Sequence, residues 1–387
     1  MNKQISSLVF SALLLSGTCS HAADNAAEVA CATFARNGTL AGVSISNGGL
    51  RLHLVNDAKS QDASTQKVSS EVSNCELFFS TDNQWLAIGA ERAVPSGWSV
   101  RVQVWDVRQA AWHKQFDVDP RPGLAGHVAL AGFFGKDDKL VIIGRREDTR
   151  DAPLTSMLVS VEGQLLDGPG YARESPAEVD AERNRVWTSK GTDRCTMFSA
   201  TLIGDLVKGP AVNRPAIQGN CIGPFPVGFP ASDTIIGAAS DGDARTWAWS
   251  VSVDMNKSNK ASLAAPPKTH ADKWVQATIQ PFLSISPDGQ AFAILRTSTH
   301  WNHFDNPGNT VNEVLVGTVE PLRFLQVVGP VPSCSAVTAF AVDHHPGKVT
   351  IAGRWCGEWK TIAVPAFEQR SIGDDPRHPA ATTPTLR

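Results

Sequence analysis

Residues 77–89 read LFFS-TDNQ-WLAIG, which is an apolar strand, a short polar turn and a second apolar strand. Residues 282–295 repeat this order as FLSI-SPDGQ-AFAIL. Apolar runs rich in β-branched and aromatic residues, separated by Asp, Asn, Gly and Pro, are typical of β-hairpins. The two stretches begin 205 residues apart, which indicates an internal repeat.

Five weaker copies of this hairpin complete the repeat. The turns of all seven copies fall near residues 38, 83, 138, 183, 233, 289 and 347, a mean spacing of about 51.5 residues. Third and fourth strands are readable in the clearest copies, for example residues 100–106 and 112–116. A four-stranded sheet cannot bury both faces alone, whereas radial stacking of sheets covers them. The spacing therefore predicts an all-β chain that forms a single β-propeller of seven four-stranded blades, with six or eight as alternatives.

Three motifs resemble WD40-like and related bacterial propeller repeats. Ser286-Pro287-Asp288-Gly289 is similar to the turn between the first two strands of such repeats. Val102-Gln103-Val104-Trp105-Asp106 resembles a WD40 third strand, and Gly126-His127 resembles the dipeptide that opens a repeat. The resemblance spans roughly residues 31–365 and implies a propeller. The two dipeptides stand in different copies, which indicates a divergent member of this superfamily.

The N-terminus has the layout of a secretory signal peptide. Lys3 is followed by a short apolar run from Leu8 to Leu15 and then by Ser20-His21-Ala22, a small-x-small cleavage site. We expect residues 1–22 to be removed after Ala22, which makes the protein secreted or periplasmic. The propeller then spans residues 23–370, and residues 371–387, rich in Pro and Thr, form a disordered tail.

Charge and hydropathy narrow the range of partners. The mature chain carries 34 basic and 38 acidic side chains with no basic block, so nucleic acid is a poor candidate. No later stretch is apolar and long enough for a transmembrane segment. We expect a monomer that binds a protein or a small ligand on the face that carries the long loops.

Cysteine use also suggests export. Loss of Cys19 with the leader leaves an even number of cysteines, which favours disulfides over a metal site in an oxidising compartment. The candidates are Cys31, Cys75, Cys195, Cys221, Cys334 and Cys356. The repeat frame favours pairing in sequence order, so that Cys31 joins Cys75, Cys195 joins Cys221, and Cys334 joins Cys356. The alternative joins Cys356 to Cys31 and closes the ring.

Few residues are candidates for catalysis, metal binding or ligand binding. His300, His303 and Asp305 lie together after the second strand of the sixth copy and are weak candidates for a divalent metal site. An exposed polar loop steadied by aromatic residues explains them more simply. The stretch Asp343-His344-His345 precedes a tight turn, and we read it as turn residues. Trp247 and Trp249 alternate along one strand, as expected for packing between blades or for a platform that binds sugars or proteins.

Two functions follow as hypotheses. The first is an exported, non-catalytic propeller that acts as a binding scaffold, with no cofactor. The alternative is a propeller enzyme, of hydrolase, lyase or lactonase type, with a metal near the central channel. The sequence contains none of the local motifs of α/β-hydrolases, zinc peptidases or nucleotide-binding proteins. Catalytic residues are therefore unknown at this stage.

Overall fold

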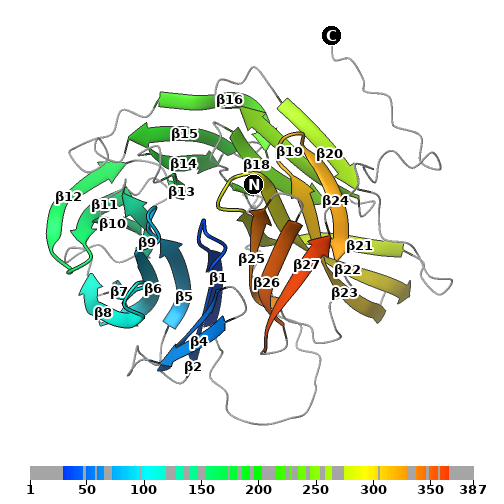
Figure 1. The fold of residues 1–387 in the computed structure, drawn as a ribbon. Coiled ribbons are helices and arrows are strands. Elements are labelled where there is room, and N and C mark those ends of the chain that lie inside the picture. The colour runs from blue at the N-terminus through cyan, green and yellow to red at the C-terminus, as the bar shows by residue number, and fades with distance from the viewer. Residues whose placement is uncertain are drawn as a thin grey trace, which may run out of the picture.

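The computed structural model describes residues 29–365 except 47–48, 57–58, 65–71, 96, 119–127, 135–138, 146–153, 173–174, 181–184, 192–195, 203–213, 223–226, 229–233, 241–244, 253–257, 264–273, 304–305, 329–336, 346–347 and 356–357. Every regular element in this part of the chain is a β-strand, so it holds no helix able to span a membrane. Strands that are hydrogen-bonded neighbours are also neighbours in sequence, and all pairs are antiparallel (Figure 1).

The strands form seven sheets in the described residues. Sheet one contains β1 (Val29–Phe34), β2 (Leu40–Ser46), β3 (Gly49–Asn56) and β4 (Lys59–Ser64). Sheet two contains β5 (Val72–Phe79), β6 (Trp85–Val94), β7 (Gly97–Asp106) and β8 (Ala111–Val118). Sheet three contains β9 (Val128–Phe134), β10 (Lys139–Arg145), β11 (Leu154–Ser160) and β12 (Leu165–Ala172). Sheet four contains β13 (Ser175–Asp180), β14 (Arg185–Gly191), β15 (Thr196–Leu202) and β16 (Arg214–Ile222).

The remaining sheets follow the same order. Sheet five contains β17 (Val227–Gly228), β18 (Thr234–Ser240), β19 (Thr246–Ser252) and β20 (Ser258–Leu263). Sheet six contains β21 (Trp274–Ile285), β22 (Ala291–His303), β23 (Asn306–Thr318) and β24 (Arg323–Val328). Sheet seven has three described strands, β25 (Val337–His345), β26 (Lys348–Trp355) and β27 (Glu358–Pro365).

The sheets are arranged around a central axis, with their first strands innermost (Figure 1). Among the described strands, β1 contacts β5, β5 contacts β9, β9 contacts β13, and β21 contacts both β17 and β25. Strand β25 also contacts β1, so the first and last sheets meet. This arrangement is that of a β-propeller, in which stacking leaves only short edges.

Sheets seven and one meet by packing, and no strand is exchanged between them in the described residues. One hypothesis from the sequence is that residues near 28–34 complete the last sheet. Strand β1 instead pairs with β2 in its own sheet, with Cys31 opposite Val43. The seam is formed by side chains, since Phe34 and Leu40 cluster with Ala341 and Ala352, and Trp359 lies over Gly42. A Cβ atom at Gly42 would lie only 2.7 Å from the Trp359 ring, so glycine is needed there.

The predicted hairpin turn forms in the same way in sheets two and six. Ser80 Oγ donates to Asp82 Oδ1 (2.7 Å) and accepts from the backbone N–H of Trp85 (2.9 Å). Ser286 Oγ makes the equivalent bonds to Asp288 Oδ1 (2.6 Å) and to the N–H of Ala291 (2.9 Å). The left-handed position is occupied by Asn83 (φ 57°) or Gly289 (φ 72°), two residue types that tolerate this conformation. The side chains thus fix the turn locally, which explains why it is readable in the sequence.

Alternate residues of each strand form the cores between sheets. Leu86 and Ile88 of sheet two pack with Leu50 and Leu52 of sheet one. The opposite face of sheet two, with Val100 and its neighbours, packs with sheet three. Sheets five and six share another core around Phe292, and sheets six and seven share one around Trp355. Burial of both faces is what makes the inner strands almost continuously apolar.

The sequence predictions for the repeat agree with this arrangement. Each of the seven predicted turns lies between the first and second strands of a different sheet. The Trp105-Asp106 pair ends β7, where Trp105 is buried and packs edge-on against Trp112. The predicted signal peptide, the Gly126-His127 pair and the 371–387 tail lie outside the described residues.

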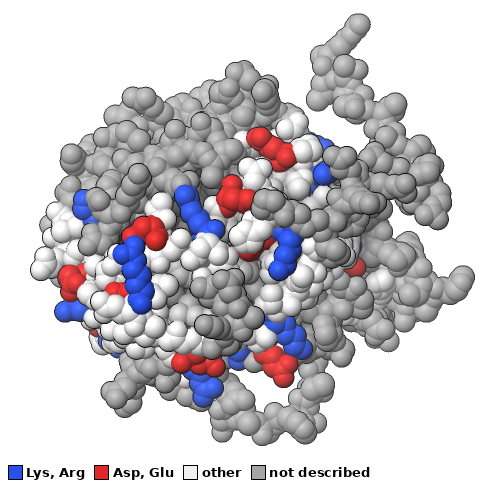
Figure 2. Space-filling model, viewed as in Figure 1, with Lys and Arg blue, Asp and Glu red and all other residues white. Residues whose placement is uncertain are grey.

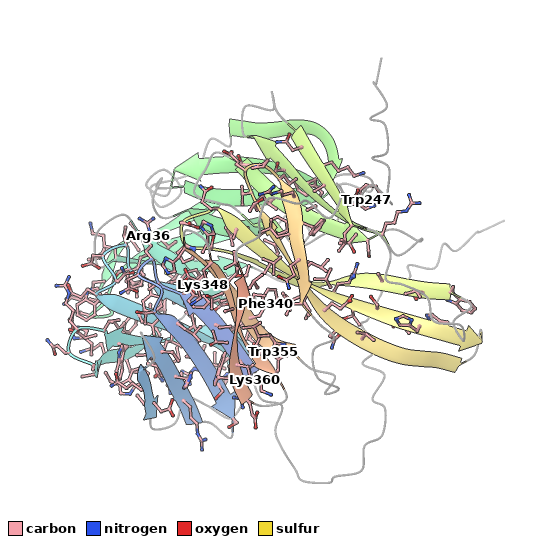
Figure 3. The ribbon with its side chains drawn as sticks, turned by 45° about the vertical axis from the view of Figure 1, so that its right-hand side comes forward. Arg36, Trp247, Phe340, Lys348, Trp355 and Lys360 are labelled. Atoms are coloured by element: carbon pink, nitrogen blue, oxygen red, sulfur yellow. A yellow bond between two sulfur atoms is a disulfide. The ribbon has the colours of Figure 1, made fainter. Side chains whose placement is uncertain are left out.

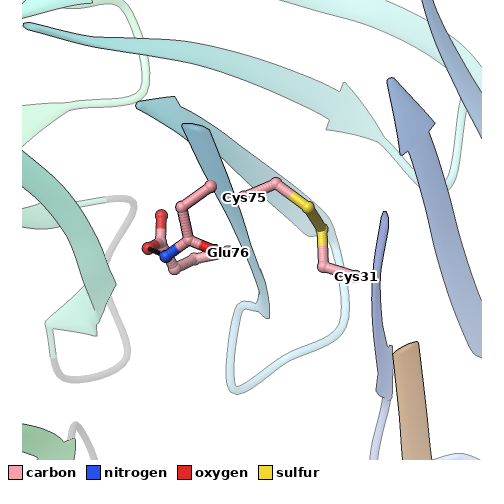
Figure 4. Close-up of a disulfide and its surroundings, with 4 residues drawn as sticks. Cys31, Cys75 and Glu76 are labelled. Carbon is pink, nitrogen blue, oxygen red and sulfur yellow. Dashed lines mark hydrogen bonds between the residues drawn. A yellow bond between two sulfur atoms is a disulfide. The ribbon is translucent and has the colours of Figure 1, made fainter. Parts of the chain in front are cut away.

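One of the predicted disulfides is present. Cys31 on β1 and Cys75 on β5 are bonded, with Cα atoms 6.0 Å apart, and join sheets one and two (Figure 4). This confirms the first pair of the sequential scheme and is incompatible with a Cys31–Cys356 bond. Cys195, Cys334 and Cys356 lie outside the described residues, and the side chain of Cys221 on β16 is not described. Those two pairs stay predictions.

Candidate functional site

Sheet six extends beyond the ring as a three-stranded arm. Strands β21, β22 and β23 have 12, 13 and 13 residues, longer than the other described strands. We call residues 274–279, 296–303 and 306–313 the arm. It projects away from the other sheets in two views (Figures 1 and 3). The sequence predicts a loop after residue 295, but β22 continues to His303 because Thr-rich alternation persists there.

The base of the arm contacts sheet five through one of its faces. Val275, Ala277 and Ser298 are buried on this face, and Ser240 Oγ of β18 donates to the carbonyl oxygen of Ala277 (2.7 Å). Arg296 is also buried, and its Nη2 donates to Glu313 Oε2 (2.7 Å). Its Nη1 donates to Thr246 Oγ1 of β19 at 3.3 Å. This charged pair anchors the arm at its base.

The other face of the arm carries aromatic and uncharged polar side chains. Its described members, which we call the arm platform, are Trp274, Gln276, Thr297, Thr299, Trp301, Thr310 and Asn312. Trp274 and Trp301 are opposite each other and stack, with ring centroids 5.7 Å apart and planes 14° from parallel. Thr297 Oγ1 donates to Asn312 Oδ1 (2.8 Å). Gln276 and Thr310 are exposed, and the other five residues are half-buried.

The indole nitrogen of Trp301 is a notable detail of the platform. Its Nε1 is buried and has no hydrogen-bond partner among the described residues. An indole N–H usually finds an acceptor when it is buried. The platform therefore presents a ring pair and several hydroxyl and amide groups, and behind them lies one buried N–H donor without an acceptor in the described part of the chain.

The predicted metal candidates lie at the end of this arm. His300 is half-buried and opposite Val275, on the face away from the platform. His303 ends β22, but its side chain and Asp305 are outside what the structure describes. Within the described residues no group of three His, Cys, Asp or Glu side chains is placed to hold a metal ion. Because two of its three residues are not described, the His300, His303 and Asp305 site stays a prediction.

The stretch Asp343-His344-His345 ends β25. Its side chains contact the first turns of the two neighbouring sheets, six and one. His344 Nδ1 lies 2.6 Å from Asp288 Oδ2 in the turn of sheet six. His345 Nε2 lies 2.9 Å from Asp343 Oδ2, and a Cβ atom at Gly38 of sheet one would approach this nitrogen to 2.8 Å. Alternation along β25 thus sends one imidazole to each neighbouring sheet. The pKa of Asp343 is raised, chiefly by burial, while hydrogen bonds from Ser286 and His344 lower that of Asp288.

Sheet two carries a pair of carboxyl groups that no motif in the sequence predicts. Glu76 on β5 and Glu91 on β6 occupy the same face as Asn74, because Glu76 is opposite Gly89 and Asn74 is opposite Glu91. Burial raises the pKa of Glu76 to about 8, with a further contribution from the charge of Glu91. A Glu residue in an apolar strand gave no motif in the sequence, since the two residues meet only through strand pairing.

The predicted tryptophan pair on sheet five mainly serves packing. Trp249 is opposite Gly237, and its ring occupies the space where a Cβ atom would be. Trp247 (Figure 3) is half-buried, and Lys260 Nζ lies over its ring, 3.7 Å from the centroid. Charged side chains of both signs are mixed on the described part of the face in Figure 2. The arm platform is thus the described region that combines paired aromatic rings with uncharged polar groups.

Comparisons with known proteins give structural likeness without a family. No family model matches the chain, and no curated protein matches it. A functionally unknown protein from Desulfotomaculum acetoxidans is 8% identical, with 78% of this chain and 86% of that chain covered and a TM-score of 0.45. Dihydro-heme d1 dehydrogenase NirN in complex with DHE is 12% identical, with 89% and 66% covered and a TM-score of 0.45. The structure of the Dos1 propeller is 13% identical, with 87% and 76% covered and a TM-score of 0.39. At these scores the fold rests on this chain's own strand order and contacts.

Proposed function

We propose that this protein is an exported, non-catalytic β-propeller of seven blades that binds an uncharged glycan on the arm platform. The observation that carries the proposal is the stacked pair Trp274 and Trp301 within a face that holds no charged residue among its seven members. Flat aromatic rings flanked by a few placed polar groups are typical of small-ligand sites. Hydroxyl and amide side chains suit the hydroxyl groups of a sugar, whose apolar ring face suits an indole.

The position of the arm supports this use. Its opposite face is anchored on sheet five by Arg296 and Ala277, so the platform is rigid before a ligand arrives. A preformed site loses less entropy on binding than a mobile loop.

The test is a screen of neutral oligosaccharides against the mature protein, followed by calorimetry on the best binder. Trp301→Ala and Trp274→Ala should each lower affinity about fivefold or more, because loss of an aromatic anchor costs about 1 kcal/mol or more. Trp247→Ala on sheet five is the matched control and should leave affinity unchanged. Failure of every oligosaccharide to bind, or binding that both arm variants retain, contradicts the glycan assignment. Turnover of any bound sugar by the purified protein contradicts the non-catalytic assignment.

Export is a separate part of the proposal. It is supported by the leader-like order of residues 1–22 and by the Cys31–Cys75 disulfide, a bond typical of oxidising compartments. The mature protein recovered from a bacterial periplasm or culture medium should begin at residue 23 by mass spectrometry. An intact N-terminus, or a protein retained in the cytoplasm with reduced Cys31 and Cys75, would contradict it.

A further inference from the structure

The carboxyl pair of sheet two lies at the rim of an apolar interface. Glu76 and Glu91 share the face of sheet two that packs on sheet three, where Val100 and Leu130 belong to one buried cluster. Leu130 of β9 lies beside Gly89, the residue opposite Glu76. Arg92, Arg101 and Asp117 form their ion pairs on the other face, as strand alternation requires. The two carboxyl groups therefore lie close together on a largely apolar surface.

The polar residues of this group extend from the protein surface into the interface. Ser73 and Asn74 are exposed, Glu76 is half-buried and Glu91 is buried. Ser73 Oγ donates to Glu91 Oε2 (2.9 Å), and Asn74 Nδ2 donates to Glu76 Oε1 (2.9 Å). Glu76 Oε2 is buried and has no hydrogen-bond partner among the described residues. An acceptor oxygen in this position is unfavourable unless a donor or a cation reaches it.

Strand β5 is held rigidly behind this pair. Cys75, between Asn74 and Glu76, points to the opposite side of the strand and is bonded to Cys31 of β1 (Figure 4). The disulfide fixes the position of β5 next to the axis of the ring, and pairing with β6 fixes Glu91 beside it. The backbone positions of Glu76 and Glu91 are thus fixed relative to each other in the absence of a ligand, which favours a preformed ion site.

We propose that Glu76 and Glu91, with Asn74 and Ser73, form a site for a hard divalent cation of the calcium type between sheets two and three. Carboxylate, hydroxyl and amide oxygen atoms are the ligands that Ca²⁺ prefers. Glu76, Glu91 and Ser73 supply the first two kinds, and Asn74, whose Nδ2 donates to Glu76 Oε1 in the free protein, would turn its amide to present Oδ1. The donor set includes neither imidazole nor thiolate, the groups that favour zinc or copper. The exposed residues Ser73 and Asn74 give the ion a path from solvent, and water completes its coordination. The site is independent of the glycan platform on sheet six.

Calorimetric titration of the mature, disulfide-bonded protein with CaCl₂, after treatment with a chelator, tests this inference. We expect one site, with Glu76→Gln and Glu91→Gln each lowering affinity at least tenfold. Glutamine has nearly the same shape as glutamate, so the variants should keep the fold, which near-ultraviolet circular dichroism checks. Glu358→Gln on β27, an exposed carboxylate beside Lys360, is the matched control and should bind Ca²⁺ as the parent does.

Three results would overturn the inference. They are no binding by the parent protein, equal affinity in the Glu76→Gln and Glu91→Gln variants, or loss of affinity in the Glu358→Gln control. Thermal melts with and without 1 mM CaCl₂, about the level at which extracellular modules bind, give an independent readout. The parent and the control should gain melting temperature with Ca²⁺, and the two site variants should not.

Discussion

Sheets two and six share one end and differ at the other. Both begin their second strand after the same Ser-x-Asp turn, with equivalent bonds from Ser80 and Ser286. At the opposite end, sheet six extends into an arm with two stacked tryptophans, whereas sheet two stops at two carboxyl groups backed by a disulfide. The comparison shows that local turn chemistry builds the blade, and that the far ends of the same strands carry the individual features.

The arm depends on its buried charge pair more than sheet two depends on any single side chain. Replacing Arg296 with Ala removes both bonds to Glu313 and leaves that carboxylate poorly paired against sheet five. Loss of one partner of a buried pair costs about 3 to 5 kcal/mol. We expect this loss in the free energy of unfolding, measured by chemical denaturation. Glu358→Ala, which breaks an exposed pair with Lys360, should change stability by less than about 1 kcal/mol. A small effect of Arg296→Ala would show that the arm is not anchored there.

The second largest loss of stability should follow removal of the disulfide in sheet two. Cys31→Ser with Cys75→Ser removes a cross-link between residues 44 apart in sequence. A loss of about 2 to 4 kcal/mol is expected, because the unfolded chain regains loop entropy. Denaturation with and without a reductant should show the same difference in the parent and no difference in the variant. Stability of the parent that is insensitive to reductant would contradict a structural role.

The buried carboxyl group of Glu76 should make the stability of sheet two depend on pH. Folding raises the pKa of Glu76 from 4.5 to about 8, so the folded state retains a proton that the unfolded chain loses. The contribution of Glu76 to stability should therefore be complete below about pH 4.5 and should be lost as the pH rises through 8. Glu76→Gln removes this dependence. With a chelator present, it should be more stable than the parent by about 4 kcal/mol at pH 8 and nearly equal to it at pH 4.5. Parallel pH profiles of the two proteins would contradict this.

Substitutions in the shared turn should lower the free energy of unfolding least. The loss should differ between sheets two and six. Asp82→Ala and Asp288→Ala each lose bonds from a serine hydroxyl and a backbone N–H, at about 1 kcal/mol. Asp288 also contacts His344, so its loss should cost more than that of Asp82. Asp82 has a weaker charged partner, since Arg108 Nη2 lies 3.5 Å from its Oδ2. With both partners removed, by His344→Ala and Arg108→Ala, the two costs should become equal, as double-mutant cycles measure. Both pKa values are lowered in the folded state, so these costs should disappear as the pH falls below about 4.

The turn and the disulfide also show how far sequence reasoning reaches. Turn positions were predictable because Ser, Asp and a residue that tolerates positive φ act within a few residues of one another. The Cys31–Cys75 bond was predictable from the repeat frame, since both residues recur near first strands. The length of the arm was missed because Thr297 and Thr299 look like loop residues in sequence, although they continue an alternating strand. Glu76 and Glu91 were missed because only strand register brings them together.

The seam between β1 and β25 has a consequence for the order of folding. All hydrogen-bonded strand pairs are neighbours in sequence, so each sheet can form from contacts a few tens of residues apart. The seam joins segments about 300 residues apart, and loop-closure entropy grows with that distance. Contacts of this range form slowly. We therefore expect the chain to build its sheets locally and to join Phe34 to Ala341 last, so that an open arc of sheets precedes the closed ring.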